Sequence, residues 1–319
     1  MVKFDMPCFI ITIDTEGDNM WRQLCSKRDR KRITIKNGAY IERFQNLCEK
    51  FNFIPTYLVD YEMTQSIPFI EMSKQKLKDK KLEIGMHMHA WTVPPDYELK
   101  IAPGYKGNPY VYEYPDSIIR KKVRYLTKTL EDIFEEKITS HRSGRWYFDK
   151  EYAGIIKENG YLVDCSVTPG INWRSNEGVT RWSKGPDYKN FPAQDYEMSL
   201  HNIKKRGESG LYEVPVSTAS LHTKRFGFSN KVMMRPNGHN LKDLLYIAEE
   251  YKILQTNYIE FMLHSSELMP GGSPYFRDKR QIEQLYDEIE SFFAILSGKY
   301  IGSSLTGYVK KRYGIGMWE

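Results

Sequence analysis

Short apolar runs alternate with longer amphipathic stretches along almost the whole chain. The apolar runs have the length and composition of buried strands, and they predict strands at 8–13, 54–59, 82–88, 138–140, 162–166, 211–216, 258–263 and 300–303. Hydrophobic side chains recur at helical spacing between them, which predicts helices at 37–51, 117–135, 149–159, 240–254 and 278–296. Such alternation favours parallel strands joined by right-handed crossovers, so the predicted class is α/β, as a barrel or a doubly wound sheet.

Three long stretches interrupt this alternation, at 91–115, 170–210 and 222–238. Each begins just after a predicted strand, at the end of the strands where such folds place their chemistry. Loops of this length in a compact domain are usually functional or disordered. Because no internal repeat or linker-like change of composition divides the sequence, we expect one domain over residues 1–319 with long loop insertions.

The composition is that of a globular protein with many aromatic residues and a mild positive charge. Aromatic side chains make up 14% of the chain, which suits a carbohydrate site as well as an ordinary core. The 47 basic and 41 acidic residues leave a net charge of +6. The densest basic run, 27–32, has no interleaved aromatic residues, so it is expected to be a solvated loop and a nucleic-acid partner is not expected.

The cysteines and the amino terminus bear on the compartment. The four cysteines are widely scattered and form no Cys-x-x-Cys pair, which favours free thiols in a reducing environment. No signal sequence is visible and no apolar run is long enough to cross a bilayer. We therefore expect a cytoplasmic protein, with a peripheral position at a membrane surface as an alternative. The long loops leave a homo-oligomer open.

Two histidines, His87 and His89, stand two residues apart at the end of an apolar run. Residues at this spacing in an extended strand point to the same side, so both imidazoles can face one point. The run at 8–13 likewise ends in acids, Asp14, Glu16 and Asp18. Two imidazoles and a carboxylate can hold a zinc-like ion and leave positions open to water and an acyl oxygen. The pattern predicts a metal or substrate site built on strand ends.

Five polar clusters follow predicted strands, at 12–18, 87–89, 140–146, 163–170 and 262–267. In this order they resemble the five motifs of the NodB-like polysaccharide deacetylases, most closely the subgroup that includes the WalW-like sugar deacetylases. The resemblance runs from Cys8 to about Ser304, and the conjunction of five motifs gives it its specificity. It implies an irregular (β/α) barrel of about seven parallel strands, one divalent metal ion, and removal of an N-acetyl group from an amino sugar.

The resemblance also implies catalytic roles for individual residues. Asp14 takes the position of the catalytic base, and Arg142 that of the arginine that orients it. Asp164 and His264 match the fourth and fifth motifs, in which the histidine protonates the departing amine. Arg145 falls where the family uses a backbone N–H in the oxyanion hole.

The first two motifs depart from the family pattern. Thr15 replaces the second acid, normally a metal ligand, and the second histidine, His89, comes two residues earlier than the common spacing. Glu16 or Asp18 could replace the missing ligand, or Asp14 could bind the metal itself. We predict Asp14 as the base and Glu16 as the ligand beside the histidines, with zinc as the expected ion.

Two tryptophans next to the motifs, Trp91 and Trp146, are expected to line the substrate site together with Arg145. His141 adjoins Arg142 on the opposite face of its strand and is expected to be structural. The histidines outside the motifs are expected at the surface: His201, His222 and His239.

These residues predict a metal-dependent hydrolase that removes an acetyl or formyl group from the nitrogen of an amino sugar in bacterial glycan biosynthesis. The expected substrate is a nucleotide-linked or lipid-linked sugar, or an oligosaccharide. One alternative is an amide hydrolase of small metabolites with the same fold, which would have a small, closed pocket. Another is a glycan-binding relative that has lost catalysis and binds little metal.

Overall fold

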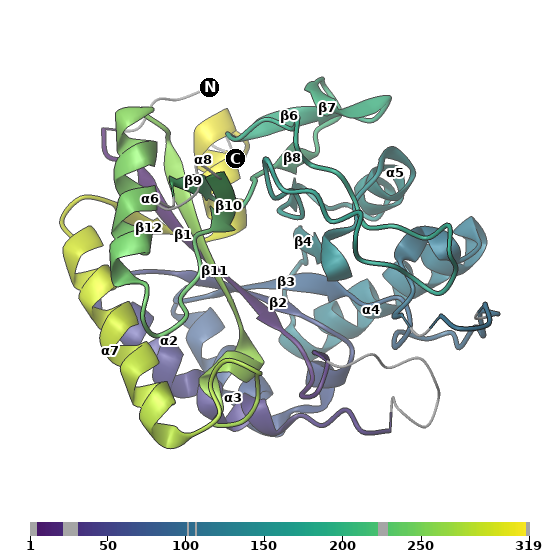
Figure 1. Ribbon diagram of the computed structural model, residues 1–319, viewed down its shortest axis with the longest axis horizontal. Helices are drawn as coiled ribbons and strands as arrows, with labels where there is room; N and C mark the ends of the chain where they lie inside the picture. The colour runs from purple at the N-terminus through teal and green to yellow at the C-terminus, as the bar shows by residue number, and fades with distance from the viewer. Residues whose placement is uncertain (1–4, 22–30, 101, 106, 223–228, 317–319) are drawn as a thin grey trace.

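The structure is a computed structural model that describes residues 5–21, 31–100, 102–105, 107–222 and 229–316 (Figure 1). Cys25 and most of the basic run at 27–32 lie outside these residues. Cys8, Cys48 and Cys165 are buried free thiols. Within the described ranges, no helix combines the length and apolar character that crossing a membrane requires.

Among the described residues, seven parallel strands follow one another across the main sheet, which curls into an open barrel (Figure 1). Their order in space is β11 (Tyr258–His264), β1 (Cys8–Thr15), β2 (Pro55–Val59), β3 (Glu83–Met88), β4 (Ser140–Ser143), β5 (Val163–Asp164) and β8 (Tyr212–Glu213). β12 (Ile301–Ser303) also pairs with β1, and β6 (Tyr196–Ser199) and β7 (Asn202–Arg206) extend the sheet beyond β8 with antiparallel pairing. The predicted irregular (β/α) barrel of about seven parallel strands is confirmed.

The open side of the barrel lies between β8 and β11. A hairpin of β9 (Thr218–His222) and β10 (Ser229–Met233) leads into this gap. The residue after it, Met234, donates its N–H to the Ser217 carbonyl at 2.8 Å and accepts the Met262 N–H at 3.1 Å. The segment that follows β10 therefore bridges the open side of the barrel, because it bonds both to β11 and to the segment after β8.

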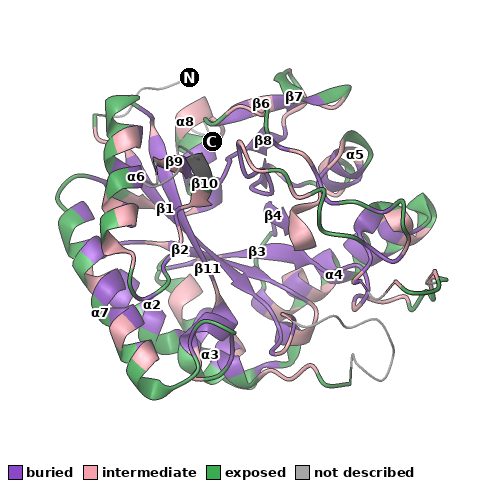
Figure 2. Cartoon of the chain, viewed as in Figure 1, coloured by how far each residue is buried: buried purple, intermediate pink, exposed green. Residues whose placement is uncertain are grey.

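Helices cover the outer face of the sheet, and the strands beneath them are largely buried (Figures 1 and 2). These helices are α2 (Ile41–Lys50), α3 (Ile67–Lys78), α4 (Asp116–Phe134), α5 (Lys150–Glu158), α6 (Leu241–Ile253) and α7 (Lys279–Leu296). The short helices η1 (Lys36–Tyr40) and η2 (Glu62–Gln65) come directly before α2 and just before α3. Phe9 of β1 shows the packing, because its ring lies 4.8 Å from that of Phe53 and 5.5 Å from that of Phe293.

Along β1, the inner face of the sheet changes from apolar to polar. α8 (Leu305–Tyr313) packs against the strand starts, where Tyr308 joins Cys8 and Ile10 in a separate apolar cluster. Farther along the same face of β1 come Thr12 and Asp14, both fully or almost fully buried. Because alternate residues of a strand share one face, the polar side chains are collected at the carboxyl end of the barrel interior.

The predicted elements were right in kind for the main sheet, but several were shifted or missed. The strand expected at 138–140 is β4, which begins at Ser140 and consists of the polar residues after the apolar run. Two helices, α3 and α8, were not predicted. The stretches 170–210 and 222–238, expected as loops, contain β6, β7 and β10.

Candidate active site

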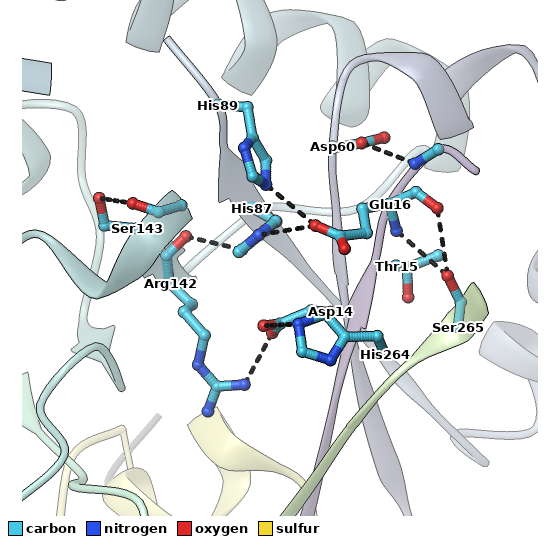
Figure 3. A network of polar contacts seen from close by, with 12 residues as sticks. Asp14, Thr15, Glu16, Asp60, His87, His89, Arg142, Ser143, His264 and Ser265 are labelled. Atoms are coloured by element: carbon cyan, nitrogen blue, oxygen red, sulfur yellow. Dashed lines mark hydrogen bonds and ion pairs between the residues drawn. The ribbon is translucent and has the colours of Figure 1, made fainter. Parts of the chain in front are cut away.

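The carboxyl ends of β1, β3, β4 and β11 meet at one place in the barrel (Figure 3). The strands are neighbours in the sheet or are separated only by β2, so the side chains that follow them converge. Six of the residues predicted from the sequence are brought together there: Asp14, Glu16, His87, His89, Arg142 and His264.

Glu16, His87 and His89 form a buried group suited to a metal ion. The Oε2 atom of Glu16 lies 3.0 Å from Nε2 of His89 and 3.6 Å from Nε2 of His87. Ligand atoms of a tetrahedral zinc site, with bonds of about 2.0–2.1 Å, lie roughly 3.3 Å from one another. Because the two measured distances bracket this value, and all three ligand atoms lie within 4.8 Å of one another, the group fits a zinc-like divalent ion.

The ring of His87 is oriented by the backbone of β4. Its Nδ1 atom lies 3.1 Å from the carbonyl oxygen of Arg142, which can only accept a hydrogen bond. Nδ1 therefore carries the proton, and Nε2 keeps its lone pair for a metal ion. Metal-binding histidines are commonly fixed in this way by a carbonyl behind the ring.

His89 is held by packing instead. Its Nδ1 atom is buried and has no hydrogen-bond partner among the described residues. The ring of Trp91 lies against it, with centroids 4.4 Å apart. Gly144 is also close, because an added Cβ atom there would lie 2.9 Å from Nδ1 of His89 and 2.7 Å from the Met88 carbonyl oxygen.

This contact makes Gly144 sensitive to substitution. We expect Gly144→Ala to displace His89 and weaken binding of Co²⁺ or Zn²⁺ by about tenfold or more, as loss of an outer partner of a metal ligand does. Titration with Co²⁺ monitored by absorption would measure the change. Gly154→Ala is the control, because an added Cβ at Gly154 meets no atom within 4 Å. Equal affinities in the two variants would contradict the packing role.

Two other residues of the first motif, Asp18 and Thr15, have structural partners. Asp18 accepts hydrogen bonds from the Thr34 hydroxyl at 2.7 Å and from the backbone N–H groups of Lys36 at 2.7 Å and Asn37 at 3.2 Å. The hydroxyl of Thr15 donates back to the Ile13 carbonyl at 3.1 Å. Of the alternatives left open by the sequence, the geometry favours Glu16 as the carboxylate ligand.

Arg142 is completely buried and binds two carboxylates. Its Nη1 donates to Asp14 at 2.8 Å, its Nη2 to Glu260 at 2.5 Å, and its Nε to the Cys165 carbonyl at 2.9 Å. Burial alone would raise the pKa of Asp14, but Arg142, His87 and His264 outweigh it and hold that pKa below its usual value. Asp14 is thus an ionised carboxylate beside the ligand group.

Glu260 is a functional candidate that the sequence did not reveal. It lies in the middle of β11, and its carboxylate also accepts the Thr12 hydroxyl at 2.6 Å. Burial raises the pKa of Glu260 to about 7, although Arg142 opposes the shift. In the sequence, Glu260 differs from its neighbours only in being the single acid of the apolar run 258–263.

His264 lies between Asp14 and a second acid. Its Nε2 is 3.6 Å from Oδ2 of Asp14, and its Nδ1 is 3.3 Å from Oε2 of Glu267. Glu267 is held in turn by Arg235 at 2.6 Å. Burial would lower the pKa of His264, but the charge of Glu16, the hydrogen bond with Glu267 and the charge of Asp14 outweigh it and raise that pKa. The ring is therefore suited to carry a proton near neutral pH.

Asp164 is not brought to this site. In β5 the neighbours Val163 and Cys165 pack in the inner apolar cluster, so Asp164 points to the outer face. There it contacts His141, with Oδ2 and Nδ1 2.5 Å apart. His141 is fully buried, consistent with the structural role expected for it. The acid next to His264 is Glu267, three residues along the chain, and not the acid of the fourth motif.

Of the three residues predicted to bind substrate, Trp91 and Arg145 contact other parts of the protein. Trp91 is only 3% exposed and supports His89 from within the protein. Arg145 has its guanidinium 3.9 Å from the centre of the Tyr110 ring, and the same group donates to the carbonyls of Asn108 and Glu177. Its backbone is left-handed, with φ at 58°, so the chain turns sharply after β4.

Trp146 lines a cleft of about 650 Å³ that opens next to His264. Its ring is nearly parallel to that of Trp173, at 8°, with centroids 6.3 Å apart. Trp21 and Tyr275 contribute further aromatic surface, and the Trp21 ring lies 4.6 Å from that of His264. Trp21, Trp173 and Tyr275 were not predicted, although each follows one of the five polar clusters by three to eight residues.

Comparisons with known proteins agree with this architecture. A protein described as a polysaccharide deacetylase from Mycobacterium smegmatis has a TM-score of 0.58 at 13% identity, over 98% of this chain and 92% of that one. One described as a polysaccharide deacetylase from Pseudomonas aeruginosa PAO1 has a TM-score of 0.53 at 11% identity, over 98% and 92%. The allantoinase PuuE has a TM-score of 0.53 at 12% identity, over 98% and 91%.

In sequence comparisons, no family model and no curated protein matches the chain. The structural comparisons therefore establish the fold, which is that of the NodB-like polysaccharide deacetylases. The resemblance predicted from the five motifs is confirmed to that extent. The likeness to the WalW-like subgroup stays a prediction.

Proposed function

We propose that the protein is a metal-dependent N-deacetylase that acts on an N-acetylated amino sugar in glycan biosynthesis. The observation that carries the proposal is the convergence of three groups at one end of the barrel. These are the ligand group of Glu16, His87 and His89, the Asp14–Arg142 pair, and His264 with its acid. Each group supplies one requirement of amide hydrolysis.

Glu16, His87 and His89 would hold the divalent ion, which when bound lowers the pKa of a water molecule and polarises the acyl oxygen. Asp14 is ionised and fixed by Arg142, so it can accept a proton from the attacking water. His264 lies between Asp14 and the aromatic cleft, and Glu267 and Asp14 raise its pKa, which favours the protonated ring. It would donate that proton to the leaving nitrogen, while Glu267 orients the ring.

The cleft favours a sugar substrate over a small metabolite. A volume of about 650 Å³ falls within the range of pockets for sizeable ligands. Its aromatic side chains, Trp21, Trp146, Trp173 and Tyr275, offer flat apolar surfaces of the kind that stack against sugar rings. The allantoinase has the same fold, so the fold alone does not separate a sugar deacetylase from an amide hydrolase of small metabolites. The shape of the cleft is what argues against the metabolite hydrolase.

The test is a screen for acetate and formate release from N-acylated amino sugars in nucleotide-linked, lipid-linked and oligosaccharide form. We expect close to one equivalent of metal in protein purified without chelator, and release that chelation abolishes and zinc, cobalt or nickel restores. Less than roughly a tenth of an equivalent of metal, with no gain from added ions, would favour the binding relative. Release confined to small metabolites would favour the other alternative.

A further inference from the structure

A row of buried polar side chains lies on the outer face of the sheet, opposite the candidate active site. His141 of β4, Asp164 of β5 and Glu213 of β8 are aligned in register on three adjacent parallel strands. None of the three is exposed to solvent. Three ionisable groups in a location that helices and loops would otherwise fill with apolar side chains call for a specific role.

Asp164 is the centre of this row. Its Oδ2 contacts Nδ1 of His141 at 2.5 Å and accepts the Ser166 hydroxyl at 2.9 Å, and its Oδ1 accepts the Ser166 N–H at 3.0 Å. His141 is fixed from its other side by the Tyr152 hydroxyl, 3.0 Å from Nε2. Both carboxylate oxygens of Asp164 are therefore used, and the side chain of Ser166 has one orientation.

Ser166 connects this row to the backbone of β4. Its hydroxyl oxygen accepts the backbone N–H of Ser143 at 2.9 Å. The ladder between β4 and β5 pairs Ser140 with Val163 and His141 with Asp164, so Ser143 lies past its end. In a continued ladder, the N–H of Ser143 would bond to a backbone carbonyl of the neighbouring strand. Here the Ser166 hydroxyl is the acceptor instead.

The residues on either side of Ser143 contact both candidate metal-binding histidines. The Arg142 carbonyl accepts the Nδ1–H of His87 at 3.1 Å. Gly144 packs against the ring of His89 so closely that a Cβ would lie 2.9 Å from its Nδ1. The segment 142–144 therefore sets the direction of both rings, and Ser166 fixes the middle of that segment.

We propose that Asp164 is a positioning residue for the metal site, which acts through Ser166 and Ser143 on the rings of His87 and His89. The inference rests on the proposed function, since it assumes that these histidines bind a metal ion. It gives the acid of the fourth motif a role that does not require contact with His264.

The test is titration of the full chain with Co²⁺, followed by the absorption of the bound ion. We expect Asp164→Asn and Ser166→Ala each to weaken Co²⁺ binding about tenfold, the lower end of the effect of losing an outer partner of a metal ligand. The absorption bands should also change, because the rings would bind at altered angles. A cooperative thermal unfolding transition shows that each variant is folded. If Asp164→Asn does not fold, the result for Ser166→Ala alone tests the proposal.

Glu213→Gln is the matched control. Burial and the neighbouring Asp164 raise the pKa of Glu213 well above its usual value, so glutamine reproduces its uncharged form. Glu213 accepts the Val167 N–H at 2.9 Å and lies in the same row, one strand farther from Ser143 than Asp164. We expect Co²⁺ affinity and spectrum like those of the wild type.

Wild-type affinity and spectrum in both Asp164→Asn and Ser166→Ala would overturn the positioning role. Equal weakening in Glu213→Gln would also overturn it, because the loss would then follow from disturbing the buried row in general. A wild-type chain that binds no Co²⁺ would instead overturn the proposed function, and the two failures are therefore distinguishable.

Discussion

Asp14→Asn is expected to abolish turnover while the protein still binds its metal ion, whereas Glu16→Gln is expected to lose the ion. Asp14 lies outside the ligand group and is held by Arg142, so its removal takes away the acceptor for the proton of water. Loss of a positioned base lowers kcat by about 10²–10⁴-fold. Glu16 has its Oε2 within 3.6 Å of both ligand nitrogens, so the amide oxygen of glutamine would be a poor replacement.

The two substitutions are a matched pair, since each replaces a carboxylate by the amide of the same shape. Elemental analysis and single-turnover kinetics on both variants separate the roles. Asp14→Asn should remain folded, because Arg142 keeps its 2.5 Å contact with Glu260 and is not left as an unpaired buried charge. Loss of metal from Asp14→Asn, with metal retained in Glu16→Gln, would exchange the assignments of base and ligand.

Much of the main sheet could be predicted from the sequence, because β1, β2, β3 and β11 are mainly apolar runs that are buried on both faces. Helices with a broad apolar stripe, such as those at 117–135 and 278–296, were equally recognisable. α3 was missed because it buries only three of its twelve side chains, so its sequence has little helical periodicity. α8 was missed because it has only nine residues, so that Leu305, Tyr308 and Val309 give a single turn of helical spacing.

The position of the site could be predicted as well, because the carboxyl ends of parallel strands meet at one edge. The period of two brought His87 and His89 to one point, as their spacing indicated. The same period directs Asp164 to the outer face, which the motif resemblance could not show. Which acid lies next to His264 depends on the turn after β11, where Glu267 folds back, and a short polar turn leaves no periodic signal.

The proton-donor role of His264 leads to a prediction with a large effect and a defined pH dependence. His264→Ala should lower kcat by about 10²–10⁴-fold, the usual contribution of a positioned acid or base. Activity requires the protonated ring, so it should fall as pH rises through the pKa of His264, which neighbouring acids raise above its usual value. A decrease of less than about tenfold in His264→Ala would remove the ring from the mechanism.

Glu267→Gln tests what sets that pKa. Glu267 lies 3.3 Å from Nδ1 of His264, whereas Asp14 lies on the side of Nε2. Because Glu267 is on the side of the ring away from Asp14, a metal ion bound at the ligand group would not cancel the effect of Glu267 on the pKa of His264. Removing its negative charge lowers the pKa of His264, and Arg235, left without its acid, lowers it further. The alkaline limb of kcat against pH should therefore move to lower pH. Glu283→Gln, which removes an exposed acid paired with Arg43, is the control and should leave the limb unchanged. A limb that stays in place in Glu267→Gln, or moves to higher pH, would show that another group donates the proton.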